Sequence, residues 1–172
     1  MLDATDTIVA LSSGSLPAGI AVLRISGPKA IAAVNRHVTR LPEPRHAGLR
    51  TIRDVDGAIV DRGLVILFPG PDSVTGEDLV ELHLHGGKAV VAACLEALTG
   101  HPGVRLAEAG EFTRRAFVNG RMDLTEAEGL ADLLAAETEF QRRLAIAQTG
   151  GAMRQACEGW MRRLTHIRAM LE

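Results

Sequence analysis

The sequence contains no Tyr, one Trp and four Phe, so aromatic residues make up only 3% of its 172 residues. A hydrophobic core must therefore be built mainly from Leu, Val, Ile and Ala. Cysteine is equally scarce, because only Cys94 and Cys157 occur, each within an apolar helical pattern. Two such cysteines argue against a disulfide framework or a Cys-based zinc site, and we expect both to be plain packing residues.

The chain also lacks long apolar runs. No stretch approaches the roughly 18 to 20 consecutive apolar residues of a membrane span. Its start, Met1 to Asp6, has no basic segment followed by an apolar run, which a secretory signal requires. We therefore expect a cytoplasmic protein without a membrane partner.

A complete nucleotide-hydrolysing motif is missing as well. A phosphate-binding loop needs Gly-x4-Gly-Lys-Ser/Thr, whose amides, Lys and hydroxyl hold the phosphates and Mg²⁺. Gly14 and Gly19 have the right spacing but precede Ile20, and Gly87-Lys88 lacks the upstream Gly and the hydroxyl. The Gly-x-Ser-x-Gly elbow of simple hydrolases is absent too. The residues present are expected to bind and associate rather than to hydrolyse a nucleotide by themselves.

The charge is unevenly distributed along the chain. The formal net charge is -2, but residues 141–172 hold six Arg against two Glu, a net charge of +4 that leaves -6 for residues 1–140. A basic tail of this kind fits either a nucleic-acid partner or a solvated helix face.

Residues 1–120 mix short β-rich runs with helical spacing and lack a strict repeat, which favours an α+β domain with a mixed sheet. Asp56-Gly57 between two such runs predicts a two-residue hairpin turn, in which both central residues have positive φ. We expect strands at 7–11, 20–25, 49–55, 58–68, 78–85 and 104–107, and helices at 29–38 and 89–98.

Residues 121–172 have the pattern of an all-α domain. Thr125 and Glu128 form a capping-box pattern that precedes an apolar stripe of about six helical turns, which Gly150-Gly151 breaks. A second helix then carries a seam that alternates by four and three residues, namely Met153, Cys157, Trp160, Leu164, Ile167 and Leu171. No stop signal follows this seam, so we expect the helix to continue beyond Glu172.

Ionisable side chains gather on one predicted strand. Glu81, His83 and His85 alternate with apolar residues and should share one face of the strand, which ends at Gly86-Gly87. A metal site would need a third or fourth partner that the sequence does not supply. Half-buried histidines or walls of a ligand pocket are the favoured interpretations, since a ligand can approach a Gly-Gly backbone closely.

Arg24 emerges from another buried strand, where an unpaired guanidinium would be costly. Either it pairs with a carboxylate such as Glu81, or it holds an anionic ligand.

Five blocks of residues, in order and at matching spacing, resemble the N-terminal region of the bacterial tRNA-modification GTPase family TrmE/MnmE. The resemblance extends from Asp6 to Glu172. The blocks are Leu23–Pro28, Phe68–Pro71, Thr75–Asp78, Glu81–Gly87 and Gly110–Leu124.

The resemblance implies a folate-binding and dimerisation domain at 1–120, similar in fold to aminomethyltransferases, and the start of a helical domain at 121–172. The GTPase domain that the family inserts into its helical domain would be absent from this chain. The family's folate-contacting positions fall on Arg24, Glu81 and Arg121, the last of which is often Lys in the family. A carboxylate suits the N–H edge of a pterin, and guanidinium groups suit the carboxylates of a glutamate tail.

The activity implied by the resemblance is modification of the wobble uridine of tRNA at C5, together with an FAD-dependent partner, MnmG or GidA. A tetrahydrofolate derivative, 5-formyl or 5,10-methylene, would supply the one-carbon unit, while GTP, Mg²⁺ and K⁺ would act outside these residues. Two alternatives stay open: a stand-alone folate-dependent aminomethyltransferase, and a non-catalytic dimerisation or tRNA-docking module that uses the basic helix.

Overall fold

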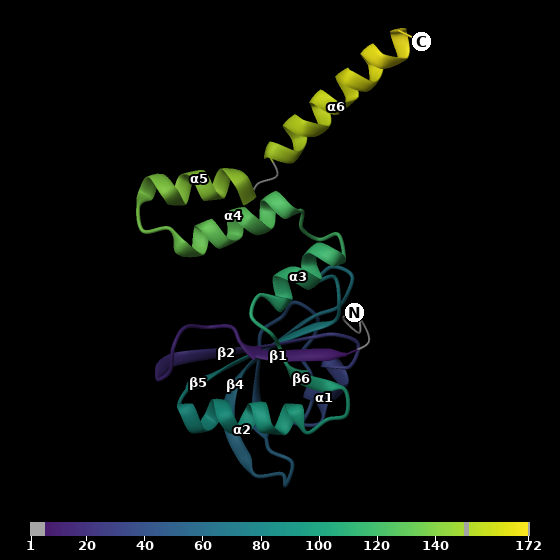
Figure 1. The fold of residues 1–172 in the computed structure, drawn as a ribbon. Coiled ribbons are helices and arrows are strands. Elements are labelled where there is room, and N and C mark those ends of the chain that lie inside the picture. Colours follow the sequence, from purple (N-terminus) through teal and green to yellow (C-terminus); the bar gives the residue numbers. More distant parts are fainter. Residues whose placement is uncertain (1–5, 150–151, 172) are drawn as a thin grey trace. The chain divides into compact units, whose positions relative to one another are not determined.

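The computed structural model describes residues 6–149 and 152–171, without the side chains of 152–155 and 171. The chain divides into two compact units, residues 1–116 and 117–172, and each is described by itself. The first is an α+β unit around a mixed sheet, and the second is helical (Figure 1).

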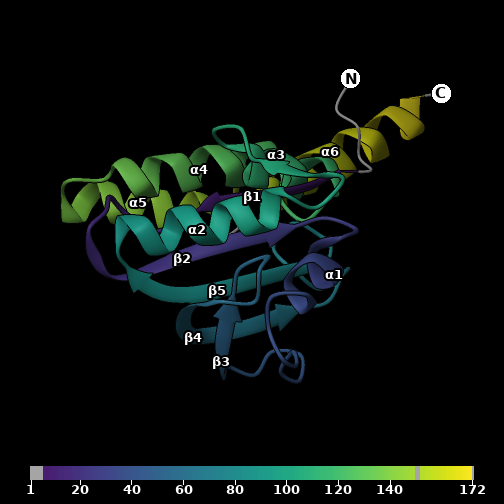
Figure 2. The ribbon, with the colours of Figure 1, turned by 90° about the horizontal axis from the view of Figure 1, so that it is seen from below.

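Six strands form one sheet in the order β3-β4-β5-β2-β1-β6. Neighbouring strands are antiparallel except β1 and β6, which are parallel. Figure 2 shows β3, β4, β5, β2 and β1 side by side in this order. The strands are β1 (Thr7–Leu11), β2 (Ala18–Ser26), β3 (Gly48–Arg53), β4 (Ile59–Phe68), β5 (Leu79–Gly86) and β6 (Val104–Leu106).

The hydrophobic core lies on one face of this sheet, under α1 (Ala30–Asn35) and α2 (Lys88–Thr99). Aliphatic residues dominate it, as the shortage of aromatic residues predicts; Leu23, Ile25 and Leu82 are almost completely buried there. Cys94 is buried in α2 and packs in this core as predicted, and burial raises the pKa of its thiol to about 12. The predicted helix at 29–38 is shorter, because Val38 leaves it to bridge Ile52.

The β3–β4 hairpin forms where Asp56-Gly57 predicts it, but its turn is longer than the predicted two residues. Gly57 has a φ of +85°, whereas Asp56 does not have a positive φ. The Asp54 carboxylate instead accepts hydrogen bonds from the backbone N–H groups of Asp56 and Ala58, at 3.0 and 2.8 Å. These hydrogen bonds from the backbone to the Asp54 side chain close the loop in place of the predicted two-residue turn with two positive φ values.

In the second unit, the N-cap of α4 (Leu124–Ala135) lies two residues before the predicted one. Asp123, rather than Thr125, is the N-cap: its carboxylate accepts from the Glu126 N–H, and the Glu126 carboxylate accepts from the Asp123 N–H. The chain offers Asp-x-x-Glu and Thr-x-x-Glu two residues apart, and the stronger N-cap residue is used.

The predicted six-turn helix is in fact two helices, α4 and α5 (Glu139–Thr149), which pack side by side. Ala136 is extended, with ψ of 121°, and the Gln141 side chain accepts from the Thr138 N–H at 2.9 Å. The Thr138 hydroxyl in turn accepts from the Gln141 N–H, so a second capping box starts α5. Gly129 permits the close approach, because a Cβ there would lie 2.8 Å from the Gln148 Cβ.

The last described helix, α6 (Ala152–Leu171), carries the predicted seam, but Trp160, Leu164 and Ile167 are exposed. Cys157 is exposed as well, so the packing role predicted for it is wrong. The Gly150-Gly151 break and the side chains of Met153 and Leu171 lie outside the described residues. Among the described helices, none is long and apolar enough to cross a membrane.

Candidate ligand-binding face

The sheet face opposite α1 and α2 carries the ionisable residues singled out in the sequence. Strand alternation places Leu23 and Leu82 in the core, so Arg24 and Glu81 point to the other face. β2 and β5 pair with Arg24 directly opposite Glu81, and both strands lie at the centre of the sheet. Antiparallel pairing thus brings together two residues that are 57 positions apart.

Arg24 and Glu81 form an ion pair. The Arg24 Nε and Nη2 both donate to Glu81 Oε1, at 3.0 and 2.8 Å, and the side chains are 29% and 16% exposed. Glu81 Oε2 lies 3.3 Å from His83 Nε2, a long contact. Of the two roles predicted for Arg24, pairing with Glu81 is therefore realised, yet the pair remains partly accessible from this face.

An aromatic ring from α3 (Glu111–Val118) lies beside the pair. The Arg24 Cζ is 5.8 Å from the centroid of the Phe112 ring, within the range of a cation–π contact. Phe112 is held by its neighbour Glu111, whose side chain is fully buried and anchors the start of α3.

Glu111 is the centre of a carboxylate–guanidinium network. Arg105 of β6 donates to both Glu111 oxygens, at 2.6 and 2.8 Å, and also to Asp6 at 2.6 Å. The Glu108 N–H donates a further hydrogen bond to Glu111 at 2.8 Å. Hydrogen bonds from Arg105, the largest influence, and from Glu108 and Arg115 lower the pKa of Glu111 to about 2, against the opposing effect of burial.

Arg115 extends this network to the loop between β4 and β5. Its guanidinium contacts Asp6, Glu111 and Glu77. Glu77 accepts from the Ser26 hydroxyl at 2.7 Å, at the end of β2. The Thr75–Asp78 block of the loop is thereby tied to β2 and α3, which fixes the surroundings of Arg24.

His85, at the end of β5, pairs with a carboxylate that the sequence did not suggest. Its Nδ1 lies 2.8 Å from Asp61 Oδ1, and its backbone N–H donates to Asp61 Oδ2 at 2.8 Å. Burial alone would raise the pKa of Asp61, but the hydrogen bonds from His85 and Arg62 outweigh it and hold that pKa below its ordinary value.

A hollow of about 210 Å³ adjoins this pair and opens over β2 to β5. Strand register puts its His83, Ile20 and Leu64 on the same face as Glu81. The residues that line it are Gly19, Ile20, Leu49, Arg62, Gly63, Leu64, His83, Leu84 and His85.

The two glycines after His85 differ in their surroundings. A Cβ at Gly86 would lie 2.3 Å from the Ala18 carbonyl oxygen, so the close approach there comes from the backbone of β2. Gly87 is the N-cap of α2, and a Cβ on it would meet only Val90 at an ordinary distance. In the described ranges, no three or more His, Cys, Asp or Glu side chains gather so that they could hold a metal ion.

Arg121 lies in the second unit, where it lines a hollow of about 270 Å³. Glu126 of the α4 capping box and Leu130 and Leu133 of α4 contribute to this hollow, together with Met122 and Thr149. Of the three positions that the resemblance assigns to a folate, the structure thus brings Arg24 and Glu81 into contact and describes Arg121 in a separate unit.

Acid unfolding should report on the buried network. The pKa of Glu111 is about 2 in the folded protein and 4.5 as an ordinary value. The ionised Glu111 carboxylate therefore contributes its full stabilisation to the folded protein above pH 4.5. This contribution is lost as the pH falls toward 2 and the carboxylate is protonated.

In Glu111→Gln, we expect the free energy of unfolding at pH 7 to fall by about 3 kcal/mol, because two guanidinium groups lose their buried partner. Its decrease between pH 5 and pH 2.5 should also be shallower than in the wild type. Urea unfolding at several pH values measures both effects, with the exposed Glu96→Gln as control. Parallel pH curves for the wild type and Glu111→Gln would contradict this assignment.

Comparison with known proteins gives a consistent result. Residues 7–121 match the family described as "GTP-binding protein TrmE N-terminus". The chain is 61% identical over 168 residues to a protein of Rhizobium meliloti (strain 1021) and 60% identical over 168 residues to one of Sinorhizobium medicae (strain WSM419), both named "tRNA modification GTPase MnmE". A Brucella canis protein of the same name is 59% identical over 167 residues.

These alignments cover 97–98% of the chain but only 38% of the length of each of the three relatives. The mixed six-stranded sheet with its helices agrees with the α+β fold that the resemblance implies. The chain therefore belongs to the TrmE N-terminal family.

Proposed function

We propose that this chain is the folate-binding and dimerising part of a tRNA-modification GTPase. The observation that carries the proposal is the Arg24–Glu81 pair, which is partly accessible on the sheet face opposite α1 and α2. The relatives named tRNA modification GTPase MnmE support the wider role.

The pair retains hydrogen-bonding capacity for a ligand. Arg24 uses Nε and Nη2 for Glu81, and its Nη1 makes no hydrogen bond to the described residues. Among the described residues, Glu81 Oε2 has only the long contact to His83. A reduced pterin offers an amino group and a ring N–H to a carboxylate, and carboxylates of a glutamate tail offer acceptors to Arg24 and Arg121.

The hollow beside His83 and His85 gives room for one end of such a ligand. Its volume of about 210 Å³ is smaller than that of a site for a whole drug-sized ligand, about 300 to 1,000 Å³. We therefore assign only the ring or the tail to the hollow, and the rest to the neighbouring surface around Phe112.

Binding of 5-formyltetrahydrofolate to this chain tests the site directly. In Glu81→Gln, the affinity should fall by about 10- to 100-fold, because a charged hydrogen bond contributes about 1.5–3 kcal/mol. Isothermal titration calorimetry measures the change. The matched control is Glu96→Gln, an exposed carboxylate on α2, which covers the opposite face.

Equal affinities of the wild type and Glu81→Gln would exclude Glu81 from the site. Arg121→Ala should weaken binding as well, and unchanged binding in that variant would remove Arg121 alone from the proposal.

For the whole protein, we extend the proposal to the reaction. A one-carbon unit of 5-formyl- or 5,10-methylenetetrahydrofolate would be attached to C5 of the wobble uridine of tRNA, with an FAD-dependent MnmG or GidA as partner. GTP hydrolysis with Mg²⁺ and K⁺ would take place in residues outside this chain. The role of Glu81 is then to hold the one-carbon donor and is separate from hydrolysis.

A full-length protein with Glu81→Gln should separate these two steps. The GTP hydrolysis rate should stay within about 2-fold of the wild-type rate, whereas modified wobble uridine should be lost, because binding of the donor is weakened. Nucleoside mass spectrometry of tRNA and a phosphate-release assay measure the two quantities. Retained modification would argue against a donor site at Glu81.

Dimerisation is supported by apolar side chains on the same face. Ile20, Leu49 and Leu64 are 64%, 57% and 41% exposed. Strand register places them on the same face, in β2, β3 and β4, where they line the hollow. Exposed apolar patches on soluble proteins mark contact surfaces. We propose that a second copy of the chain covers this patch.

Leu64→Asp should then shift the protein toward the monomer and raise the dimer dissociation constant by at least about 100-fold, because a charge would be buried in the interface. Sedimentation equilibrium measures the shift, and Val55→Asp in the β3–β4 turn serves as control. Identical dimer populations in the wild type and Leu64→Asp would exclude this face as the dimer contact.

A further inference from the structure

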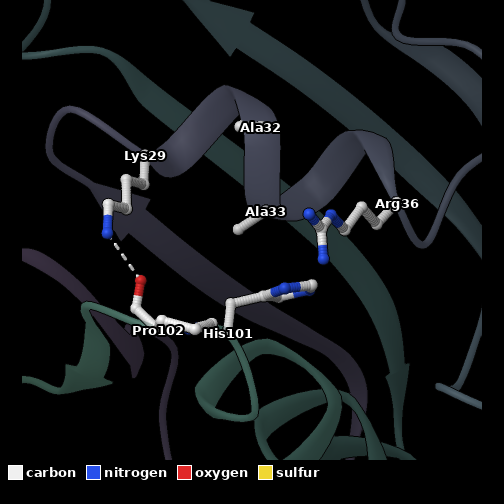
Figure 3. Close-up of a pocket in the computed structure, with 6 residues that line it drawn as sticks. All are labelled: Lys29, Ala32, Ala33, Arg36, His101 and Pro102. Atoms are coloured by element: carbon white, nitrogen blue, oxygen red, sulfur yellow. Dashed lines mark hydrogen bonds between the residues drawn. The ribbon is translucent and has the colours of Figure 1, made fainter.

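A third hollow lies on the side of the sheet that α1 and α2 cover. Its volume is about 340 Å³, and it lies between α1 and the loop that leads into β6 (Figure 3). Six residues line it: Lys29, Ala32, Ala33, Arg36, His101 and Pro102. Three of them are Lys, Arg and His, and none is acidic.

The cations at this hollow keep their charge uncompensated. Lys29 Nζ donates to the Pro102 carbonyl oxygen at 2.7 Å, which holds the ammonium group at the rim without neutralising it. Arg36 is exposed, and its guanidinium group makes no hydrogen bond or ion pair with the described residues. Figure 3 shows its guanidinium group turned toward the His101 ring.

The ring of the buried His37 positions the His101 side chain. The His101 Nε2 lies 2.8 Å from Nε2 of His37, whose Nδ1 lies 2.9 Å from the Arg53 carbonyl oxygen. A carbonyl only accepts, so His37 Nδ1 carries the proton. When both rings are neutral, His101 must donate from Nε2, and its Nδ1 remains unprotonated. Burial, and then the positive charges of His37 and Arg36, hold the pKa of His101 below its ordinary value.

Positive charge continues beyond the hollow along the chain. Residues 28–53 contain six Lys or Arg and a single acidic residue, Glu43. Arg50 and Arg53 donate to the backbone carbonyls of Arg40, Leu49 and Gly57, which do not cancel their charge. Arg24, Arg105 and Arg115, by contrast, all pair with carboxylates.

We infer that Lys29 and Arg36, beside the His101 ring, form a phosphate-binding site for a backbone phosphate of an RNA strand, and that Arg40, Arg50 and Arg53 extend its contact with the same strand. Several cations that no carboxylate neutralises, within one stretch of the chain, fit a polyanion better than one small phosphate compound. The methyl groups of Ala32 and Ala33 and the Pro102 ring give the hollow an apolar floor, against which a base or ribose can pack. That the RNA is a tRNA rests on the proposed function; the phosphate chemistry does not.

The test compares three double variants of the chain, each of which removes two positive charges. Lys29→Gln with Arg36→Gln changes the proposed site, and Arg142→Gln with Arg143→Gln changes cations on α5 that pair with Glu139. Arg162→Gln with Arg163→Gln tests the basic helix α6 as a rival RNA contact. Fluorescence anisotropy with labelled tRNA between 50 and 200 mM salt gives the affinity and its salt dependence, and circular dichroism verifies folding.

We expect the Lys29/Arg36 variant to bind tRNA about 10- to 30-fold more weakly, with the slope of log K against log salt reduced by about 2, since each phosphate contact contributes about 0.9. The α5 control should lose less than about 3-fold. Equal losses in both variants would mean that only net charge matters, and would overturn the site. A loss confined to the α6 variant would overturn it in favour of the rival contact.

A titration with inorganic phosphate, followed by NMR of the His101 imidazole, distinguishes the source of the phosphate. If phosphate binds in the hollow while tRNA affinity is the same in the wild type and the Lys29/Arg36 variant, the site takes a small phosphate compound, and the RNA proposal is wrong. Binding of 5-formyltetrahydrofolate should not change in the Lys29/Arg36 variant, so failure of this inference and failure of the folate site give different results.

Discussion

The buried contacts of Glu111 determine how the first unit is put together. Its carboxylate receives Arg105 of β6, and Arg115, one helical turn further on, reaches Asp6 and Glu77. Four separate stretches of the chain therefore meet at one cluster of charges, none of which could be buried alone without a large cost in solvation. Because Phe112 is adjacent to Glu111, the same cluster sets where an aromatic ring lies over Arg24.

Local pattern was sufficient for the strands and their faces. The alternation of Leu82 with Glu81 and His83 predicts which side chains enter the core, since a strand has a period of two, and the register confirms it. The β3–β4 hairpin was predicted for a similar reason, because Asp56-Gly57 restricts the chain to a turn. The turn type of this hairpin was not predicted correctly, because the Asp54 side chain accepts hydrogen bonds from the backbone of the turn and so closes the loop differently.

Contacts between distant positions could not be predicted in this way. Arg105 and Asp6 are 99 residues apart, and Asp61 and His85 are 24 apart, so no spacing rule indicates that they pair. The division of the six-turn stripe into α4 and α5 is a different failure. Thr138 and Gln141 carry a capping signal, but the apolar periodicity on either side of it conceals the boundary.

The place of Arg24 and Glu81 in the sheet affects how a ligand would be received. They stand opposite each other on the two central strands, and each strand is hydrogen-bonded to neighbours on both sides. Their separation is therefore set by the backbone ladder during folding, and no loop has to close to assemble the pair. The conformational entropy of bringing the two side chains together is therefore lost on folding, before a ligand binds. This favours a single-step association without a slow conformational phase.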